Sequence, residues 1–455
     1  MNRRNKLALE IVLGVVLLII MVFTAEKEGT KLSFLVYVTF VINGVAFYCF
    51  MIKSICKYAF SLEFIHNLFL LIFFWISPMI QIADGFTPWG LSYGEDYIFK
   101  ANMMILVWCL LFNGGIRIAK NKYINFCNNR MHISVTNKSY IKILLNITII
   151  ITIIYIWKNG VSFGGFGEDN SVFNIQIQSM SVLVDHCLTG FVTFSTMFTI
   201  IYYKNRVVNK SIVIIQIVCL ILVAFPLSIS RYAAGSIYSC LLVHMFPSLK
   251  KGHKFILLFS ISFMILFPLL GMFRYSSISE IMLNDILISM KSIRKYYVSG
   301  NFDAYQMIIA TIKVVEARGY TWGQQLLGTF LFFVPRSMWQ NKPVSTGTYI
   351  ANELGLSFGN ISCPINMEFY IDFGVFGYIF IAFLLGYIVS VIDNSYWKAE
   401  TVKKVSILTI GYPFMVPFFL FMCRGSLMST YSNFCAYIAM LISICKLSNV
   451  KIRIR

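Results

Sequence analysis

Charged residues are scarce in this sequence, and acidic ones are the scarcest. Asp, Glu, Lys and Arg make up 13% of the 455 residues, about half the share typical of a soluble globular protein. Hydrophobic residues reach 58%, and the mean hydropathy is +0.75. This composition excludes an ordinary soluble domain. It predicts an all-α polytopic membrane protein, because a helix satisfies its own backbone hydrogen bonds inside a bilayer.

The sequence also lacks any CxxC pair, and its five histidines lie far apart. Most of the 11 cysteines fall inside apolar runs. Zinc sites and disulfide frameworks need cysteines or histidines at short, regular spacings. We therefore expect no metal and no cofactor.

The sequence is instead rich in long apolar runs. A spanning helix needs about 20 apolar residues, and the hydropathy pattern predicts twelve spans. The first is interpreted as a retained helix because it is long and lacks a small-residue cleavage site. The predicted spans are about 7–25, 32–52, 62–83, 101–119, 143–157, 181–203, 211–229, 232–248, 255–273, 376–396, 405–423 and 427–446.

Three regions follow from this pattern: a membrane bundle over 1–273, a large extracytoplasmic loop over 274–375, and C-terminal membrane helices over 376–455. In the large loop, residues 278–319 have the apolar spacing of amphipathic helices. The stretch WGQQLLGTFLFFVP, residues 322–335, is too short to span. We expect it to be re-entrant or interfacial and to end at Pro335.

The formal net charge is +19, with 38 Lys and Arg against 19 Asp and Glu. Most of the basic residues fall in alternate short loops, as expected if those loops and both termini are cytoplasmic. The positive charge is then explained by membrane topology, and no nucleic-acid partner is expected.

Four arginines break this charge bias, at the ends of helices expected to face outward or in the large loop: Arg231, Arg274, Arg336 and Arg424. Lys342 lies near one of them. Guanidinium groups suit phosphate because they present planar, bidentate donors and stay charged. The set predicts a shared site for the diphosphate of a lipid-linked substrate. The alternative for each arginine alone is contact with lipid headgroups.

Acidic and aromatic residues lie close to Arg336 and Lys342 in sequence. Glu368 and Asp372 are four residues apart and would share a helix face. Either is a candidate general base or sugar contact, or simply a first-turn acid favoured by the helix dipole. Trp339 and Tyr370 are candidate sugar-stacking rings, with interfacial anchoring as the alternative. Asp393 is expected to pair with a nearby Lys or Arg.

Two local patterns occur in this region: PRSMWQNKP, from Pro335 to Pro343, and P-x-x-x-E-x-Y-x-x-F-G-x-x-G, from Pro364 to Gly377. Ten residues also separate Arg336 from Gly347. In these patterns and in its expected topology the chain resembles the oligosaccharide repeat-unit polymerases, also called O-antigen or Wzy-type polymerases. The arginine-to-glycine spacing is not repeated after Arg231 or Arg274.

The resemblance implies a GT-C-like glycosyltransferase architecture and a metal-independent reaction on undecaprenyl-diphosphate-linked oligosaccharide, which serves as donor and acceptor. The expected partners are membrane lipid, a flippase and a chain-length regulator, and the expected location is the bacterial plasma (inner) membrane. The implied catalytic residues are Arg336, Arg274, Glu368 and Asp372, with substrate contacts from Arg231, Arg424, Lys342, Trp339 and Tyr370. Fixed cations would stabilise the departing diphosphate.

Two other functions stay open: an O-antigen ligase-like transferase, and a flippase or other transporter of the lipid-linked unit. Composition does not separate the polymerase from the ligase. A transporter of the inverted-repeat type would show paired halves and broken helices in matching positions. No such internal repeat is visible in the sequence.

Overall fold

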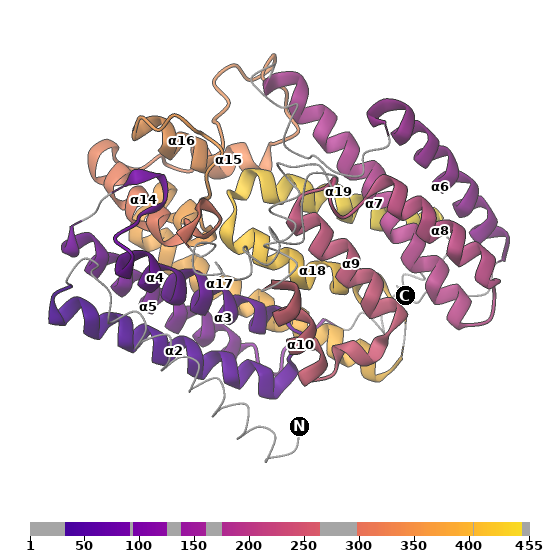
Figure 1. Ribbon diagram of the computed structural model, residues 1–455, viewed down its shortest axis with the longest axis horizontal. Helices are drawn as coiled ribbons and strands as arrows, with labels where there is room; N and C mark the ends of the chain where they lie inside the picture. Colours follow the sequence, from indigo (N-terminus) through magenta and orange to yellow (C-terminus); the bar gives the residue numbers. More distant parts are fainter. Residues whose placement is uncertain are drawn as a thin grey trace, which may run out of the picture.

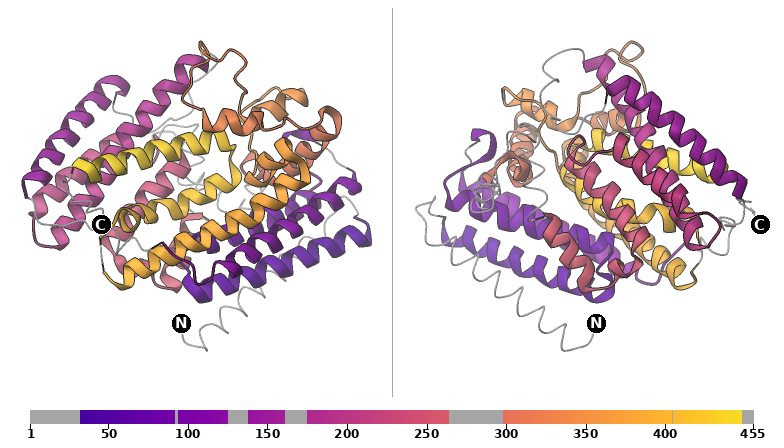
Figure 2. Two further views of the ribbon diagram at one scale, coloured as in Figure 1. Left: turned by 180° about the vertical axis from the view of Figure 1, so that it is seen from behind. Right: turned by 45° about the vertical axis from the view of Figure 1, so that its right-hand side comes forward.

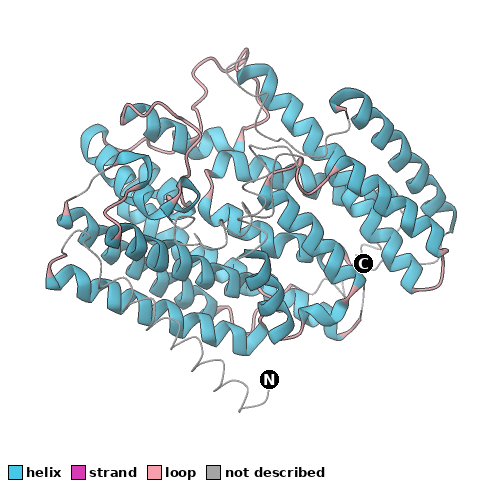
Figure 3. Cartoon of the chain, in the orientation of Figure 1, coloured by secondary structure: helices cyan, strands magenta, loops and turns pink. Residues whose placement is uncertain are grey.

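In the computed structural model the described residues form helices joined by loops and turns, and no strand occurs among them (Figure 3). Those residues are 32–91, 94–124, 138–160, 175–263, 298–403 and 405–447.

The α-helices of the first half are α2 (Phe34–Tyr58), α3 (Leu62–Leu71), α4 (Ser77–Ala83), α5 (Glu95–Ile118), α6 (Lys138–Asn159), α7 (Ile175–Lys204), α8 (Lys210–Val223), α9 (Arg231–Met245) and α10 (His253–Ile261). A π-helical turn, η1 (Ile72–Ile76), joins α3 to α4, and the short 3-10 turns η2 (Pro88–Gly90) and η3 (Pro247–Lys250) lie in loops. The second half contains η5 (Gly300–Phe302), α14 (Ala304–Arg318), α15 (Gln324–Phe330), α16 (Thr346–Glu353), α17 (Ile365–Thr401), α18 (Ile407–Arg424) and α19 (Leu427–Leu447).

Eight helical segments in the described part of the chain are long and apolar enough to cross a membrane. They coincide with eight of the predicted spans. The predicted span 7–25 lies outside the described residues, and α10 covers only the start of 255–273. α8 and α9 contain 14 and 15 residues and are shorter than predicted. The membrane character of the fold is therefore supported, whereas the total of twelve spans stays a prediction.

The helices form two packed groups that share the C-terminal helices (Figures 1 and 2). One core joins α2, α3, α5, α14 and α17, and the other joins α6, α7, α8, α9 and α19. α18 contributes buried side chains to both cores, so it links the two groups. Because α14 lies inside the first group, its run from Ala304 to Ile312 is buried. This part of the segment is helical, as predicted, but the run from Ala304 to Ile312 is buried on every face and not on one face alone.

α5 and α17 cross at close range because each has a glycine at the contact. A Cβ atom on Gly386 of α17 would lie 1.9 Å from the carbonyl oxygen of Phe112. A Cβ atom on Gly115 of α5 would lie 2.2 Å from the carbonyl oxygen of Phe383. Small residues let membrane helices bring their backbones together in this way. The pair fixes α17 against the first group of helices.

Three carboxylates of α17 accept hydrogen bonds from the first turns of three other helices. Glu368 caps α19, Asp372 caps α15 and Asp393 caps α3. The amide donors are those of Leu427 at 2.6 Å, Gln325 and Leu326 at 3.2 and 2.9 Å, and Leu62 and Glu63 at 3.0 Å each. A helix N-terminus carries unpaired N–H groups and partial positive charge, so a buried carboxylate is stabilised there. Among the described residues Asp393 pairs with helix N–H groups and a tyrosine hydroxyl, and not with the Lys or Arg that we expected.

The basic loops gather at one end of the bundle. Lys250 bonds Glu400 at 2.5 Å, and Trp397 Nε1 donates to the carbonyl oxygen of Phe60 at 3.1 Å. Asn394 Nδ2 donates to the carbonyl oxygens of Lys120 and Lys122 at 3.0 Å each. α18 starts just after the basic segment 398–404 and ends at Arg424, about 25 Å away at 1.5 Å per residue. Arg424 and the segments around it therefore lie at the opposite end of the bundle. Which of the two ends faces the cytoplasm stays a prediction from the charge rule.

Candidate anion-binding cavity

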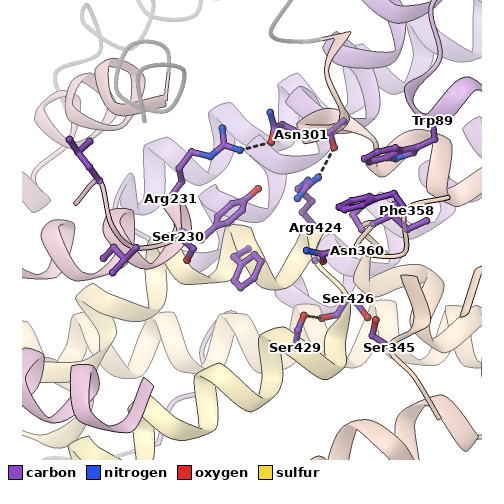
Figure 4. Close-up of a pocket in the computed structure, with 18 residues that line it drawn as sticks. Trp89, Ser230, Arg231, Asn301, Ser345, Phe358, Asn360, Arg424, Ser426 and Ser429 are labelled. Atoms are coloured by element: carbon purple, nitrogen blue, oxygen red, sulfur yellow. Dashed lines mark hydrogen bonds between the residues drawn. The ribbon is translucent and has the colours of Figure 1, made fainter. Parts of the chain in front are cut away.

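A cavity of about 480 Å³ opens at the end of the bundle that lies away from the basic loops (Figure 4). Its wall is built from loops and helix ends that are far apart in sequence. The lining residues are Trp89, Leu227, Ile229, Ser230, Arg231, Tyr232, Gly300, Asn301, Ser345, Phe358, Asn360, Ile361, Ser362, Phe421, Arg424, Gly425, Ser426 and Ser429. Among the residues that the structure describes, this lining contains two arginines and no carboxylate.

Arg424 comes from the last residue of α18, and the first residues of the next segment close the cavity beside it. Its Nη2 atom donates to the carbonyl oxygen of Gly300 at 2.9 Å and to Oδ1 of Asp303 at 2.8 Å. Its Nε atom is buried and has no hydrogen-bond partner among the described residues. Arg424 is thus a positioned cation that retains an unsatisfied donor.

Asp303 organises this wall from behind. Its carboxylate is fully buried and also accepts from Trp89 Nε1 at 3.0 Å and Ser362 Oγ at 2.6 Å. The backbone N–H of Ser362 donates to it as well, at 3.3 Å. A buried carboxylate is stable only when it is paired and hydrogen-bonded. Asp303 therefore fixes three cavity-lining side chains relative to one another.

Arg231 approaches from the second group of helices. It is the first residue of α9, and the side chain of Ser230 accepts a capping hydrogen bond from the N–H of Ala233. Its Nη2 atom donates to Oδ1 of Asn301 at 2.5 Å. Arg231 and Arg424 are held by Asn301 and Gly300, two adjacent residues, and Figure 4 shows both guanidinium groups beside this turn. Two of the four predicted arginines therefore come together.

Serine side chains from several segments add neutral hydroxyl groups to the rim. Ser345 precedes α16, and Ser426 and Ser429 lie at the start of α19. Because hydroxyl groups donate and accept, they suit phosphate oxygens and sugar hydroxyls alike. The cavity thus combines positive charge with polar groups of low steric demand.

Glu368 lies one hydrogen bond behind the cavity wall. Ser426 Oγ donates to its Oε1 atom at 3.1 Å, the Leu427 N–H donates to the same atom, and Thr346 Oγ1 donates to Oε2. Glu368 is fully buried and does not line the cavity. Any contact between this carboxylate and a ligand would have to pass through Ser426.

Arg336 and Lys342 bind the backbone of their own loop. Arg336 donates to the carbonyl oxygens of Lys342 at 2.5 Å and Pro343 at 3.1 Å, and Lys342 Nζ donates to those of Phe332 at 2.6 Å and Val334 at 2.9 Å. Burial lowers the pKa of Lys342, and the positive charge of Arg336 lowers it further. Neither side chain lines the cavity. This reciprocal clamp shapes the segment that leads to Ser345, which does line it.

The other predicted site residues lie elsewhere. Asp372 of α17 is buried against the first turn of α15, and Thr321 Oγ1 also donates to it. Tyr370 packs edge-on against Tyr320 and Tyr378. Trp339 is half-buried in the turn after Pro335. None of these three side chains lines the cavity, and Arg274 lies outside the described residues.

Sequence reasoning missed Asp303, Asn301, Trp89 and Phe358. A signal for Asp303 exists, because it is the only acidic residue between Asp285 and Glu316. The other three give no comparable signal, since they lie in short turns without a repeated pattern.

The described residues contain no group of three or more His, Cys, Asp or Glu side chains that could hold a metal ion. Neither a family model, nor a curated protein, nor a solved structure matches this chain. The functional argument therefore depends on the cavity and on the sequence patterns.

Proposed function

We propose that this chain polymerises lipid-linked oligosaccharide repeat units, and that the cavity binds the diphosphate of a polyprenyl-diphosphate-linked glycan. The observation that supports the proposal most directly is the approach of Arg231 and Arg424 in one cavity, away from the basic loops. Under the charge rule that end of the bundle faces outward. Fixed guanidinium groups at this depth suit a phosphate group at the membrane surface better than a soluble nucleotide.

In the proposed reaction, a hydroxyl oxygen of the incoming repeat unit attacks the anomeric carbon of the donor glycan. The bond from that carbon to the phosphate oxygen breaks, and polyprenyl diphosphate leaves with the bonding electrons. The two arginines stabilise the negative charge that grows on the leaving group. Preorganised donors of this kind contribute about 10²–10³-fold to a rate.

The attacking hydroxyl must lose its proton, and Ser426 with Glu368 provides a route. In this route the proton passes to Ser426 Oγ as the Ser426 proton passes to Glu368 Oε1. The 3.1 Å hydrogen bond between these two atoms already has the required donor and acceptor. Because Thr346 and the Leu427 amide stay bound to Glu368, the carboxylate remains in place throughout the step.

Deletion of the gene tests this function. We expect the deletion strain to make surface glycan that carries a single repeat unit in place of a ladder of lengths. Loss of a flippase would trap the lipid-linked unit on the inner face, and loss of a ligase would leave long chains on the polyprenyl carrier. A deletion strain with a normal ladder would reject the proposal.

A further inference from the structure

One wall of the cavity consists of two stacked aromatic rings. Trp89 of η2 and Phe358, from the loop between α16 and α17, have ring centroids 5.6 Å apart and planes inclined by 24°. Figure 4 shows the pair beside Arg424 and Asn360. Phe358 is 49% exposed, which is unusual for a phenylalanine that packs against another ring. Its exposed surface is thus available at the cavity wall.

The indole of Trp89 is held from several directions. A Cβ atom on residue 300 would lie 2.8 Å from Cζ2 of Trp89, so only glycine allows the chain to pack there. The indole N–H is bound to Asp303 at 3.0 Å. Trp89 also has φ +65°, a backbone conformation that a bulky residue adopts only when its surroundings impose it. Because Trp89 is held in this way, it provides a fixed surface against which the ring of Phe358 stacks.

We propose that Phe358 is a platform for the sugar ring next to the bound diphosphate, with Trp89 as its positioning residue. This inference rests on the proposed function. The negatively polarised face of an aromatic ring attracts the C–H groups on one face of a sugar, while hydroxyl groups at the sugar edge reach polar neighbours. Asn360 and Ser345 provide such neighbours in the same wall.

The shared partner Asp303 links the two halves of this site. It bonds Arg424, which we assign to the phosphate, and Trp89, which supports the platform. A phosphate held by the arginines would therefore place the first sugar at a fixed separation from Phe358. The chemistry recognised is a sugar joined directly to a phosphate, not a prenyl chain and not a free anion.

The test measures binding of three probes to the purified full-length protein in detergent micelles: farnesyl diphosphate, and farnesyl diphosphate carrying either N-acetylglucosamine or galactose. We expect the wild-type protein to bind a sugar-bearing probe about 3- to 10-fold more tightly than farnesyl diphosphate. Phe358→Ala should reduce this affinity ratio, sugar-bearing probe over farnesyl diphosphate, to about one. The affinity for farnesyl diphosphate itself should not change. Phe358→Tyr should keep the ratio.

The matched control is Phe86→Ala, because Phe86 is 47% exposed and does not line the cavity. This variant should keep the wild-type ratio. If neither sugar increases the affinity of the wild-type protein, or if Phe358→Ala weakens all three probes equally, the platform is overturned while the anion site stands. Equal weakening would indicate a contact with the prenyl chain. If no probe binds the wild-type protein, the proposed function and the platform both fail.

Discussion

Arg424 and Asp303, which are 121 residues apart in sequence, form an ion pair at 2.8 Å at the edge of the cavity. The Asp303 side chain is fully buried, and that of Arg424 is 14% exposed. The pair closes the loop between α18 and α19 onto the turn before α14. It thereby joins the end of α18 to the segment 300–303, and both contribute to the cavity wall or support it.

Asp303→Asn should destabilise the protein by about 3 kcal/mol or more, because it leaves a buried guanidinium group without its counter-charge. Thermal unfolding of the purified protein in detergent measures this effect. The matched control is Glu353→Gln, which breaks the pair with Arg318, whose side chain is 65% exposed. That pair should contribute at most about 1 kcal/mol. Equal effects of the two substitutions would contradict the role given to Asp303.

The clamp between Arg336 and Lys342 predicts that the two alanine variants are coupled. Each should lower the stability by about 1–3 kcal/mol, because part-buried carbonyl groups lose charged donors. The double variant should lose less than the sum, since each side chain holds the segment that presents the other. Thermal unfolding provides the measurement. Lost glycan chains in an Arg336→Ala protein of unchanged stability would instead support direct contact of Arg336 with substrate.

Asp372→Ala should affect α15 locally. It removes the acceptor of the Gln325 and Leu326 amides, so these two amides should exchange with solvent faster. The loss of stability should be about 1–3 kcal/mol. Hydrogen exchange read by mass spectrometry gives the local result, and the amides of Leu62 and Glu63, which Asp393 caps, are the internal control. Unchanged exchange in α15 would contradict the capping role.

Two adjacent glycines on α5 give opposite predictions. Gly115→Ala would place a Cβ atom 2.2 Å from the carbonyl oxygen of Phe383, so α5 and α17 must separate and the stability should fall by several kcal/mol. Gly114 has nothing within 4 Å of its Cβ position. Gly114→Ala should therefore raise the stability, by up to about 1 kcal/mol, through helix propensity. Thermal unfolding of both variants checks the α5–α17 contact, and similar results for the two would refute it.

The spans were predictable because hydropathy is a local property. α18 and α19 lie within two residues of their predicted ranges, whereas α2 ends six residues later and α5 begins six residues earlier than predicted. The predicted span 376–396 omits the first turns of α17, which are more polar and follow Pro364, although Glu368 and Asp372 were expected to share a helix face. Gly374, with φ +62° inside α17, marks where the predicted span begins.

The candidate site was predictable only in part. Arg231 and Arg424 stand out because they interrupt apolar loops expected to face outward. Arg336 stands out for the same reason, yet its donors bind the adjacent backbone, and no sequence pattern separates these two uses of an arginine. Asp303 and Phe358 depend on contacts between distant segments, which a single sequence does not reveal.

The direct test of the central claim is the length distribution of surface glycan in a deletion strain that carries Arg231→Ala. Wild-type protein should restore the full ladder, and Arg231→Ala should reduce chain extension about 10²-fold while the protein still inserts at normal abundance. The control is Arg117→Ala, which removes an exposed arginine at the opposite end of the bundle and should restore the ladder. A full ladder with Arg231→Ala would contradict the account.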